Sequence, residues 1–262
     1  MQTWKLEIEY EGTRYRGWQQ QKNARSVQAE IIAAAENALE MPVEIGGAGR
    51  TDAGVHALRQ IAHLRVRDPL PPALTPRRLQ FLINDHLPHD INLRRVANAL
   101  PSFHARHDAN MRYYLYQIST RRTAFGKQYV WWVKDRLDVR AMAEAATLFV
   151  GAHDFRSFCE SPTQQESTRV HVETSQITQA DDLILFRLGA SHFLWKMVRR
   201  IVGTLVEIGR GSIGKTDVQR MLRQLSRENA AWTAPPSGLF LEQVCYAGDA
   251  PPATLTPIFP VH

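Results

Sequence analysis

The chain has only two cysteines, Cys159 and Cys245, among its 262 residues. Two cysteines so far apart exclude a disulfide framework and any zinc site built on paired cysteines. No hydrophobic run approaches the length that crosses a bilayer, and the first residues, MQTWK, lack the apolar core of a signal peptide. These absences predict a soluble protein of a reducing cytoplasm, without a membrane partner.

The excess of basic over acidic residues is also small. Lys plus Arg number 32 against 26 Asp plus Glu, which gives a net charge of +6. Four arginine pairs concentrate the positive charge: Arg77-Arg78, Arg94-Arg95, Arg121-Arg122 and Arg199-Arg200. This balance is compatible with a polyanionic partner and with an ordinary basic enzyme, so it favours nucleic acid only slightly.

Glycine is concentrated in residues 46–57, which read GGAGRTDAGVHA. Four glycines within nine positions allow the backbone to take positive φ angles or to approach a ligand closely. Arg50 and Asp52 lie between them. An arginine beside an aspartate can hold the carboxylate ionised and oriented, and such a carboxylate can act as a nucleophile or a base. The stretch therefore predicts an active site, with a glycine-rich surface turn as an equal alternative on spacing alone.

The hydrophobic pattern of the first half predicts the order β-α-β-β-α-β. Strands are expected at residues 4–10, 43–45, 60–66 and 91–96. Ser26 is expected to cap the first helix, and Thr75 followed by Pro76 is expected to begin the second. A connection that contains Pro69, Pro71 and Pro72 precedes the second helix.

The strands and helices predicted for the second half follow the same order, although the two halves share no detectable sequence repeat. The strands of this second half are expected at residues 112–120, 170–172, 183–188 and 239–246, and its helices at 138–149, at 194–208 and from Asp217. The helix at 194–208 has a wide apolar stripe, and the residues placed off it are Lys196, Arg199, Arg200 and Gly203. Two ferredoxin-like units are predicted, 1–105 and 106–262, whose sheets could adjoin.

Several motifs resemble those of the TruA-type tRNA pseudouridine synthases. The family's signature is matched by GRTDAGVHA at 49–57. The other motifs follow in the family's order: YEGT at 10–13, GWQ at 17–19, SVQ at 26–28, LPHDI at 87–91, FHAR at 103–106, RYYLY at 112–116, MVR at 197–199, IVG at 201–203 and GL at 238–239. They cover most of the chain. Arg59 is a departure, because the family usually has glycine there, and the strand that leaves the loop is expected to differ slightly in shape.

The resemblance implies a fold and a set of residue roles. The fold is α+β, with two ferredoxin-like (RRM-like) halves that share a mainly antiparallel sheet and a catalytic cleft between them. Asp52 resembles the catalytic nucleophile, and Arg50 resembles the residue that holds the extruded nucleotide. Arg199 resembles the arginine thought to pair with the carboxylate, and Tyr114 the tyrosine that stacks on the target uracil.

The implied reaction requires no cofactor, because forming pseudouridine involves no net oxidation or energy input. The sequence is consistent with this, since it has no phosphate loop, dinucleotide fingerprint or convincing metal motif. A single carboxylate can attack the anomeric carbon, or it can remove a sugar proton to give a glycal. The target base must also leave its stack. The sequence does not choose between the two routes.

Each candidate residue also has a structural interpretation. Arg50 could form only an ion pair, and Arg199 could lie on a solvated helix face while Arg200 faces the cleft. Tyr114 alternates along a strand, which is typical of core residues, and Tyr113 faces the other way. His104 and His107 suggest a metal site, which we reject because a third ligand is missing.

Other residues receive weaker interpretations. Four tryptophans are expected in the core or at an interface: Trp131, Trp132, Trp195 and Trp232. Three basic residues are candidates for phosphate contacts or for solvated surface: Lys196, Arg121 and Arg122.

The resemblance implies a cytoplasmic homodimeric isomerase that acts in tRNA processing, on uridines 38, 39 and 40 of the tRNA anticodon arm. One alternative is a relative with the same chemistry and another RNA target. Another is a non-catalytic RNA-binding module, although the chain lacks the aromatic pattern of such sheets and retains Asp52.

Overall fold

The chain forms two compact units, which the computed structural model describes over residues 2–67 and 74–261. The first unit contains Met1–Asn110 and Leu241–Ala250, and the second contains Met111–Phe240 and Pro251–His262. The division expected from the sequence, at residues 105 and 106, placed Leu241–Ala250 with the second half. Three prolines of the predicted connection lie outside the described residues: Pro69, Pro71 and Pro72.

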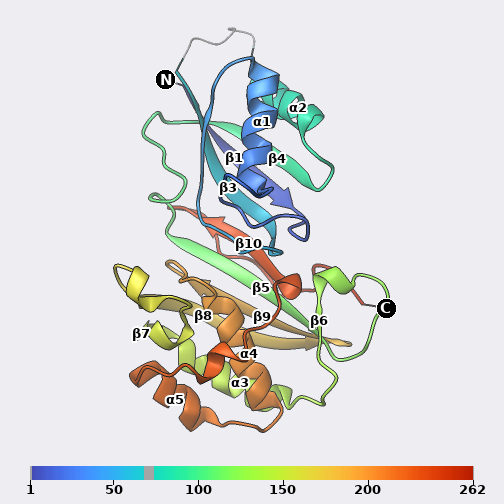
Figure 1. The fold of residues 1–262 in the computed structure, drawn as a ribbon, viewed down its shortest axis with the longest axis vertical. Coiled ribbons are helices and arrows are strands. Elements are labelled where there is room, and N and C mark those ends of the chain that lie inside the picture. The colour runs from blue at the N-terminus through green and yellow to red at the C-terminus, as the bar shows by residue number, and fades with distance from the viewer. Residues whose placement is uncertain (1, 68–73, 262) are drawn as a thin grey trace. The chain divides into compact units, whose positions relative to one another are not determined.

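The first unit is an antiparallel sheet with two helices (Figure 1). Its elements are β1 (Gln2–Tyr10), α1 (Val27–Leu39), β2 (Glu44–Gly47), β3 (His56–Val66), α2 (Pro76–His86) and β4 (Ile91–Ala99). β1 pairs with β3 and β4, and β2 pairs with β3, all antiparallel. The Leu241–Cys245 part of β10 (Leu239–Cys245) lies beside β3. The predicted β-α-β-β-α-β order is confirmed.

Alternation of side chains gives the β1 strand one apolar and one charged face. Trp4, Leu6 and Ile8 are fully buried, whereas Lys5 and Glu7 between them are partly exposed. Successive side chains of a strand point to opposite faces, so this pattern assigns one face to the core. The helices supply the other side of that core through residues such as Val27, Ile31, Leu79 and Ile83.

The two predicted helix caps differ in their hydrogen bonds. Thr75 Oγ1 accepts from Arg78 N at 3.2 Å, and Pro76 begins α2 as expected. Ser26 occupies the cap position of α1, but its side chain makes no capping hydrogen bond. α1 therefore depends on its buried apolar face more than on its cap.

The second unit also has a mainly antiparallel sheet. Its elements are β5 (Met111–Ser119), β6 (Trp131–Trp132), α3 (Val139–Ala146), β7 (Gly151–Asp154), β8 (Arg169–Ala180), β9 (Leu183–Ala190), α4 (Met197–Gly209) and α5 (Lys215–Arg223). The strand order is β5-β9-β8-β7, and β6 runs parallel to β5. α3 packs on α4 and on β8 (Figure 1). The predicted α+β class with mostly antiparallel strands is confirmed.

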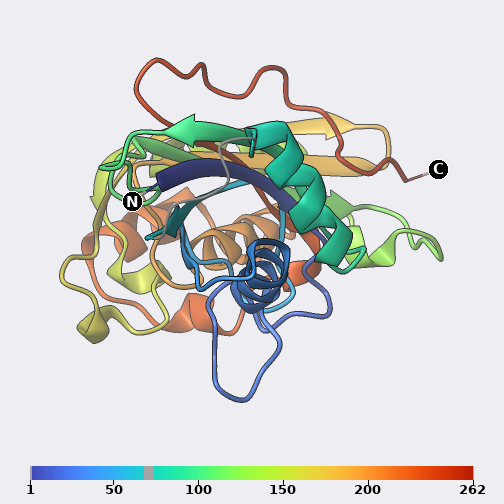
Figure 2. The same ribbon diagram turned by 90° about the horizontal axis from the view of Figure 1, so that it is seen from above.

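Several elements of the second unit were not expected. β6 and β7 contain two and four residues, too few for a hydrophobic period to show. The helix expected at 138–149 is α3 followed by a 3-10 turn, Thr147–Phe149. After β10 the described chain continues as an irregular segment without helix or strand, which is prominent in Figure 2.

The prediction that Arg200 and Gly203 lie off the apolar face of α4 is wrong. Arg200 is buried, and its guanidinium donates to Cys159 O at 2.8 Å and forms an ion pair with Glu160. Gly203 is also buried, and an added Cβ would lie 1.6 Å from Trp232 O. Segments distant in sequence cover this face of α4, and a helical period alone does not reveal them.

Within residues 2–67 and 74–261, no helix has both the length and the apolar character needed to span a bilayer.

Candidate active site

The glycine-rich stretch is the loop between β2 and β3, and β3 holds its first part. Ala48 N donates to Ile61 O at 2.7 Å. Gln60, a buried residue of β3, donates from Nε2 to Gly49 O at 3.0 Å. The backbone is therefore fixed up to the residue that precedes Arg50.

The segment that follows β1 holds the middle of the loop. Trp18 N donates to Thr51 O at 3.1 Å, and Gly54 N donates to Tyr15 O at 3.2 Å. The buried hydroxyls of Tyr10 and Thr51 are hydrogen-bonded to each other at 2.8 Å. Burial raises the pKa of the Tyr10 phenol, so this partner stays protonated. The loop is thus anchored on both sides of residue 52.

Asp52 is partly exposed on this anchored loop. Its carbonyl oxygen accepts from Val55 N at 3.2 Å, and this hydrogen bond closes a turn. Gly54, within the turn, has a positive φ of +78°. A backbone fixed at both sides restricts where the carboxylate can lie before a substrate arrives, which suits an attacking nucleophile. The geometry is compatible with the predicted role of Asp52, which stays a prediction.

Gly17 allows the closest approach between the two segments. It has φ +93°, and a Cβ added there would lie 2.5 Å from Thr51 O and 3.2 Å from the carbonyl carbon of Asp52. Any other residue would therefore displace the backbone that carries the candidate nucleophile.

Gly17→Ala is expected to lower the free energy of unfolding by roughly 2–4 kcal/mol, because a backbone clash adds to left-handed strain. Gly211→Ala is the matched control, since Gly211 has φ +77° but no atom within 4 Å of its added Cβ. It should cost only the strain, about 1–2 kcal/mol. Urea denaturation of both variants measures the difference. Equal losses would show that the approach to Thr51 is not tight.

Arg50 is exposed and is held by a relay of two glutamines. Its Nε donates to Gln19 Oε1 at 3.0 Å, and Gln19 Nε2 donates to Gln28 Oε1 at 2.7 Å. Gln28, in the first turn of α1, donates in turn to Ile45 O at 2.7 Å. The sequence included both glutamines in family motifs but predicted no role for them. Their amide groups link the guanidinium to the backbone of Ile45, the buried residue of β2.

Tyr114 lies in β5 with only 7% of its surface exposed. Its ring meets Phe193 edge to face, with centroids 4.9 Å apart. Tyr116, on the same face, is fully buried and donates its hydroxyl to Pro235 O at 2.8 Å. Tyr113 packs instead against Gly189 of β9. The sequence distinguished Tyr113 from Tyr114 by alternation, but it did not reveal Phe193, which lies in the loop before α4.

The two arginines of α4 differ in exposure. Arg199 is partly exposed, and its Nε donates to Ala234 O at 2.7 Å. Arg200 is buried and bound by Glu160 and by backbone carbonyls of its own unit. Arg200 is therefore engaged within its own unit, and Arg199 is the more exposed of the two arginines.

The histidines that suggested a metal site have structural partners. His104 Nδ1 accepts from the backbone N of Arg106 at 3.2 Å and of His107 at 3.3 Å. His63, which the sequence analysis did not single out, accepts from Ala105 N at 3.1 Å. Burial lowers the pKa of His104 and brings that of His63 to about 4, so both are neutral near pH 7. Among the described residues no group of three His, Cys, Asp or Glu side chains could hold a metal ion.

Two of the four tryptophans expected in the core or at an interface are exposed. Trp132 is 40% exposed and Trp195 is 47% exposed, whereas Trp131 and Trp232 are partly buried. A core position is therefore wrong for Trp132 and Trp195. Trp132 lies in the two-residue strand β6 and Trp195 in the loop before α4, and both stretches are too short for a hydrophobic period to report burial.

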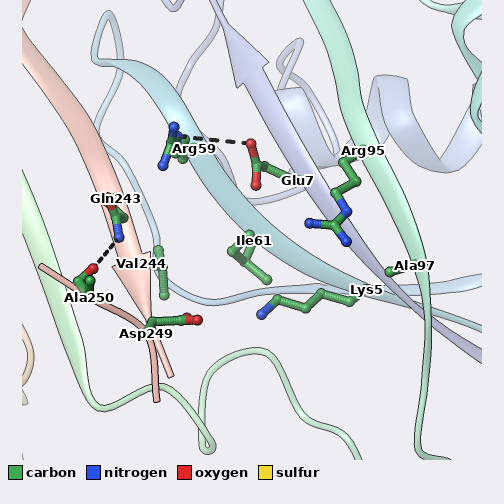
Figure 3. A pocket seen from close by; sticks show the side chains of 10 residues that line it. All are labelled: Lys5, Glu7, Arg59, Ile61, Arg95, Ala97, Gln243, Val244, Asp249 and Ala250. Carbon is green, nitrogen blue, oxygen red and sulfur yellow. Dashed lines mark hydrogen bonds and ion pairs between the residues drawn. The ribbon is translucent and has the colours of Figure 1, made fainter. Parts of the chain in front are cut away.

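A groove of about 290 Å³ lies on the charged face of the first unit's sheet (Figure 3). Its lining includes Lys5 and Glu7 of β1, Arg95 of β4 and Asp249. Arg59 also lines it, 3.9 Å from Glu7, where the register of β1 and β3 shifts. Because cations and carboxylates alternate here, the groove does not favour a single small anion.

The structure places the predicted site residues in two groups. Arg50 and Asp52 share the anchored loop of the first unit. Tyr114 on β5 and Arg199 on α4 belong to the second unit.

Comparison with known proteins identifies the class. The family model of the tRNA pseudouridine synthases matches residues 7–108 and 145–247. A tRNA pseudouridine synthase A of Thermoanaerobacter sp. (strain X514) is 37% identical over 241 residues, 91% of this chain and 97% of the relative. One of Maricaulis maris is 38% identical over 253 residues, 95% of this chain and the whole relative. The chain belongs to the tRNA pseudouridine synthase family, whose members are isomerases.

A chain of a solved Cbf5-Nop10-Gar1 complex is 12% identical, with a TM-score of 0.33. The match covers 78% of this chain and 54% of that chain, and it is too weak to support an argument.

Proposed function

We propose that the protein converts uridine to pseudouridine in the anticodon stem-loop of tRNA, at positions 38, 39 and 40, with Asp52 as the nucleophile. The observation that carries this proposal is the anchored loop, which presents an aspartate within the GRTDAG motif in a member of this enzyme family. The second candidate function is the same reaction on uridines of another RNA.

The reaction is an isomerisation, so atoms balance without a co-reactant. The bond between C1′ and N1 of the base breaks, the base rotates, and a bond forms between C1′ and C5. C5 loses its proton and N1 gains one. The Asp52 carboxylate either bonds transiently to C1′ or removes a sugar proton, and both routes regenerate it.

Two of the other proposed site residues act on the nucleotide that leaves the stack, and the third acts on the carboxylate. Arg50 occupies the gap or holds the extruded base, which offsets a few kcal/mol of unstacking. Tyr114 stacks on the uracil, and Arg199 provides a cation for the carboxylate. The glutamine relay supports Arg50 in this role, because it restricts the guanidinium before RNA binds.

Three further assignments come from the family resemblance. We propose a homodimer that works in the cytoplasm, with halves 1–105 and 106–262 of which the first carries the catalytic loop. The proposal also includes a catalytic cleft between the two halves. A non-catalytic RNA-binding module is disfavoured, because the loop around Asp52 retains several specific backbone contacts that such a module does not require.

Incubation of unmodified tRNA transcripts with the protein should produce pseudouridine at positions 38, 39 or 40, detected by chemical mapping of the modified nucleotide. Transcripts with cytidine at these three positions are the control and should remain unmodified. Pseudouridine at other sites only would favour the second candidate, and its complete absence would contradict the proposed function.

A further inference from the structure

A turn in the second unit exposes aromatic side chains to an unusual degree. We call residues 120–132 the Phe125 turn. Phe125 is 84% exposed and Trp132 is 40% exposed. Of the large hydrophobic side chains in the described residues, Phe125 is the most exposed. Aromatic side chains are enriched at binding surfaces relative to the rest of a protein surface.

The same turn carries exposed basic side chains. Arg122 and Lys127 are exposed, and the Arg122 guanidinium lies 5.8 Å from the Trp132 ring centroid. Two nearby acids have cationic partners, Asp182 with Arg121 at 2.8 Å and Asp135 with Arg210 at 2.8 Å. The turn therefore presents positive charge to solvent, interleaved with aromatic rings.

The turn is held rigidly enough to keep Phe125 outside. Thr123 Oγ1 donates to Phe125 O at 2.7 Å and accepts from Phe125 N at 3.2 Å. Gly126 has φ +65°, and a Cβ there would lie 2.2 Å from the Phe259 ring. Phe259 also packs on Tyr129, with ring centroids 5.0 Å apart. The chain after β10 thus supports the turn from beneath.

A buried glutamine fixes that support. Gln117 of β5 is fully buried; its Oε1 accepts from Ile258 N at 2.7 Å, and its Nε2 donates to Tyr129 O at 3.0 Å. One amide therefore ties both the turn and the C-terminal segment to the sheet. A preformed aromatic platform loses little conformational freedom on binding.

We propose that the Phe125 turn is an RNA-contacting surface, on which Phe125 stacks against an unpaired base while Arg122 and Lys127 contact phosphates. This rests on the proposed function insofar as the RNA is tRNA. Aromatic stacking and backbone cations together are the chemistry of binding to unpaired nucleotides. Aromatic and arginine side chains also suit a protein partner, and Lys127 is the residue that favours RNA, because the centres of protein interfaces are depleted of lysine.

Three substitutions at Phe125 separate stacking from apolar contact. Phe125→Ala and Phe125→Leu should each weaken tRNA binding about 10-fold, because neither retains an aromatic face, whereas Phe125→Trp should bind like wild type. Phe81→Ala is the matched control, since Phe81 on α2 is 56% exposed and also lies near an arginine, 5.7 Å from Arg77. Its affinity for tRNA should not change.

Lys127→Gln tests the phosphate contact. It should lower the slope of log affinity against log salt by about 1, without altering preference among RNA sequences. An unchanged slope would remove Lys127 from the contact surface.

Several outcomes would overturn the proposal. They are a tRNA affinity of Phe125→Ala equal to that of wild type, a tRNA affinity of Phe125→Leu equal to that of wild type, and a loss of tRNA affinity in Phe81→Ala as large as that in Phe125→Ala. A fall in sedimenting mass of Phe125→Ala would assign the turn to contact with a second copy of the chain instead.

The same variants distinguish this proposal from the proposed function. If pseudouridine forms while Phe125→Ala binds normally, only the RNA surface is wrong. If no pseudouridine forms but the Phe125 series changes RNA affinity as expected, the surface stands and the proposed reaction fails.

Discussion

Asp52→Asn is expected to reduce turnover by roughly 10³-fold or more while tRNA affinity stays close to wild type. The substitution removes the charge of the proposed nucleophile and nearly preserves side-chain volume. The contacts that hold the loop involve the backbone around residue 52, such as Trp18 N to Thr51 O and Val55 N to Asp52 O. Loop conformation should therefore survive. Release of tritium from C5-labelled uridine in tRNA measures turnover directly.

Asp85→Asn is the matched control for this experiment. Asp85 is an exposed aspartate of α2, so its substitution makes the same chemical change away from the loop. It should retain wild-type turnover. An Asp52→Asn enzyme that keeps more than a small fraction of activity would remove Asp52 as the nucleophile, provided that mass spectrometry excludes deamidation back to aspartate.

Tyr114→Phe is expected to bind tRNA normally and to react about 10²-fold or more slowly in single turnover. Phenylalanine retains the ring that we propose to stack on the uracil and the edge-to-face contact with Phe193, but it lacks the hydroxyl. A phenol beside the rotated base can help move the proton from carbon. Rapid-quench measurement at saturating enzyme separates this chemical step from binding. Tyr113→Phe, on the opposite face of β5, is the control.

Tyr114→Ala should impair both steps, because it also removes a stacking surface worth about 1–3 kcal/mol. Near-normal single-turnover rates in Tyr114→Phe would reduce the residue to a stacking platform. Equal tRNA affinity for Tyr114→Ala and wild type would remove it from the binding site.

The elements of the first unit were predictable because their signals are local. Alternation over β1, a proline after a capping threonine at α2 and glycines between β2 and β3 each depend on neighbours in sequence. The start of β3 at His56 was predicted four residues too late, because residues 56–59 continue from the glycine-rich loop without a clear period.

The contacts that position the candidate site were not predictable in the same way. Arg200 reads as a polar helix position, yet Glu160 and the carbonyl of Cys159 satisfy its charge in the interior. Gln28 reads as a surface residue of α1, yet it links Ile45 to the partner of Arg50. These roles depend on which distant segment covers a residue, and no sequence period contains that information.

The segment Leu241–Ala250 also has a consequence for biosynthesis. β3 is translated early, and β2 covers only part of one of its edges. The rest of that edge pairs with the Leu241–Cys245 part of β10, which is translated about 140 residues after β4 ends. At about 5–20 residues per second, this delay lasts roughly 10–30 s. During it the nascent chain carries an open strand edge that can pair with another chain. Folding of the first unit is therefore completed only near the end of translation of these 262 residues, although nearly all of its sequence is made first.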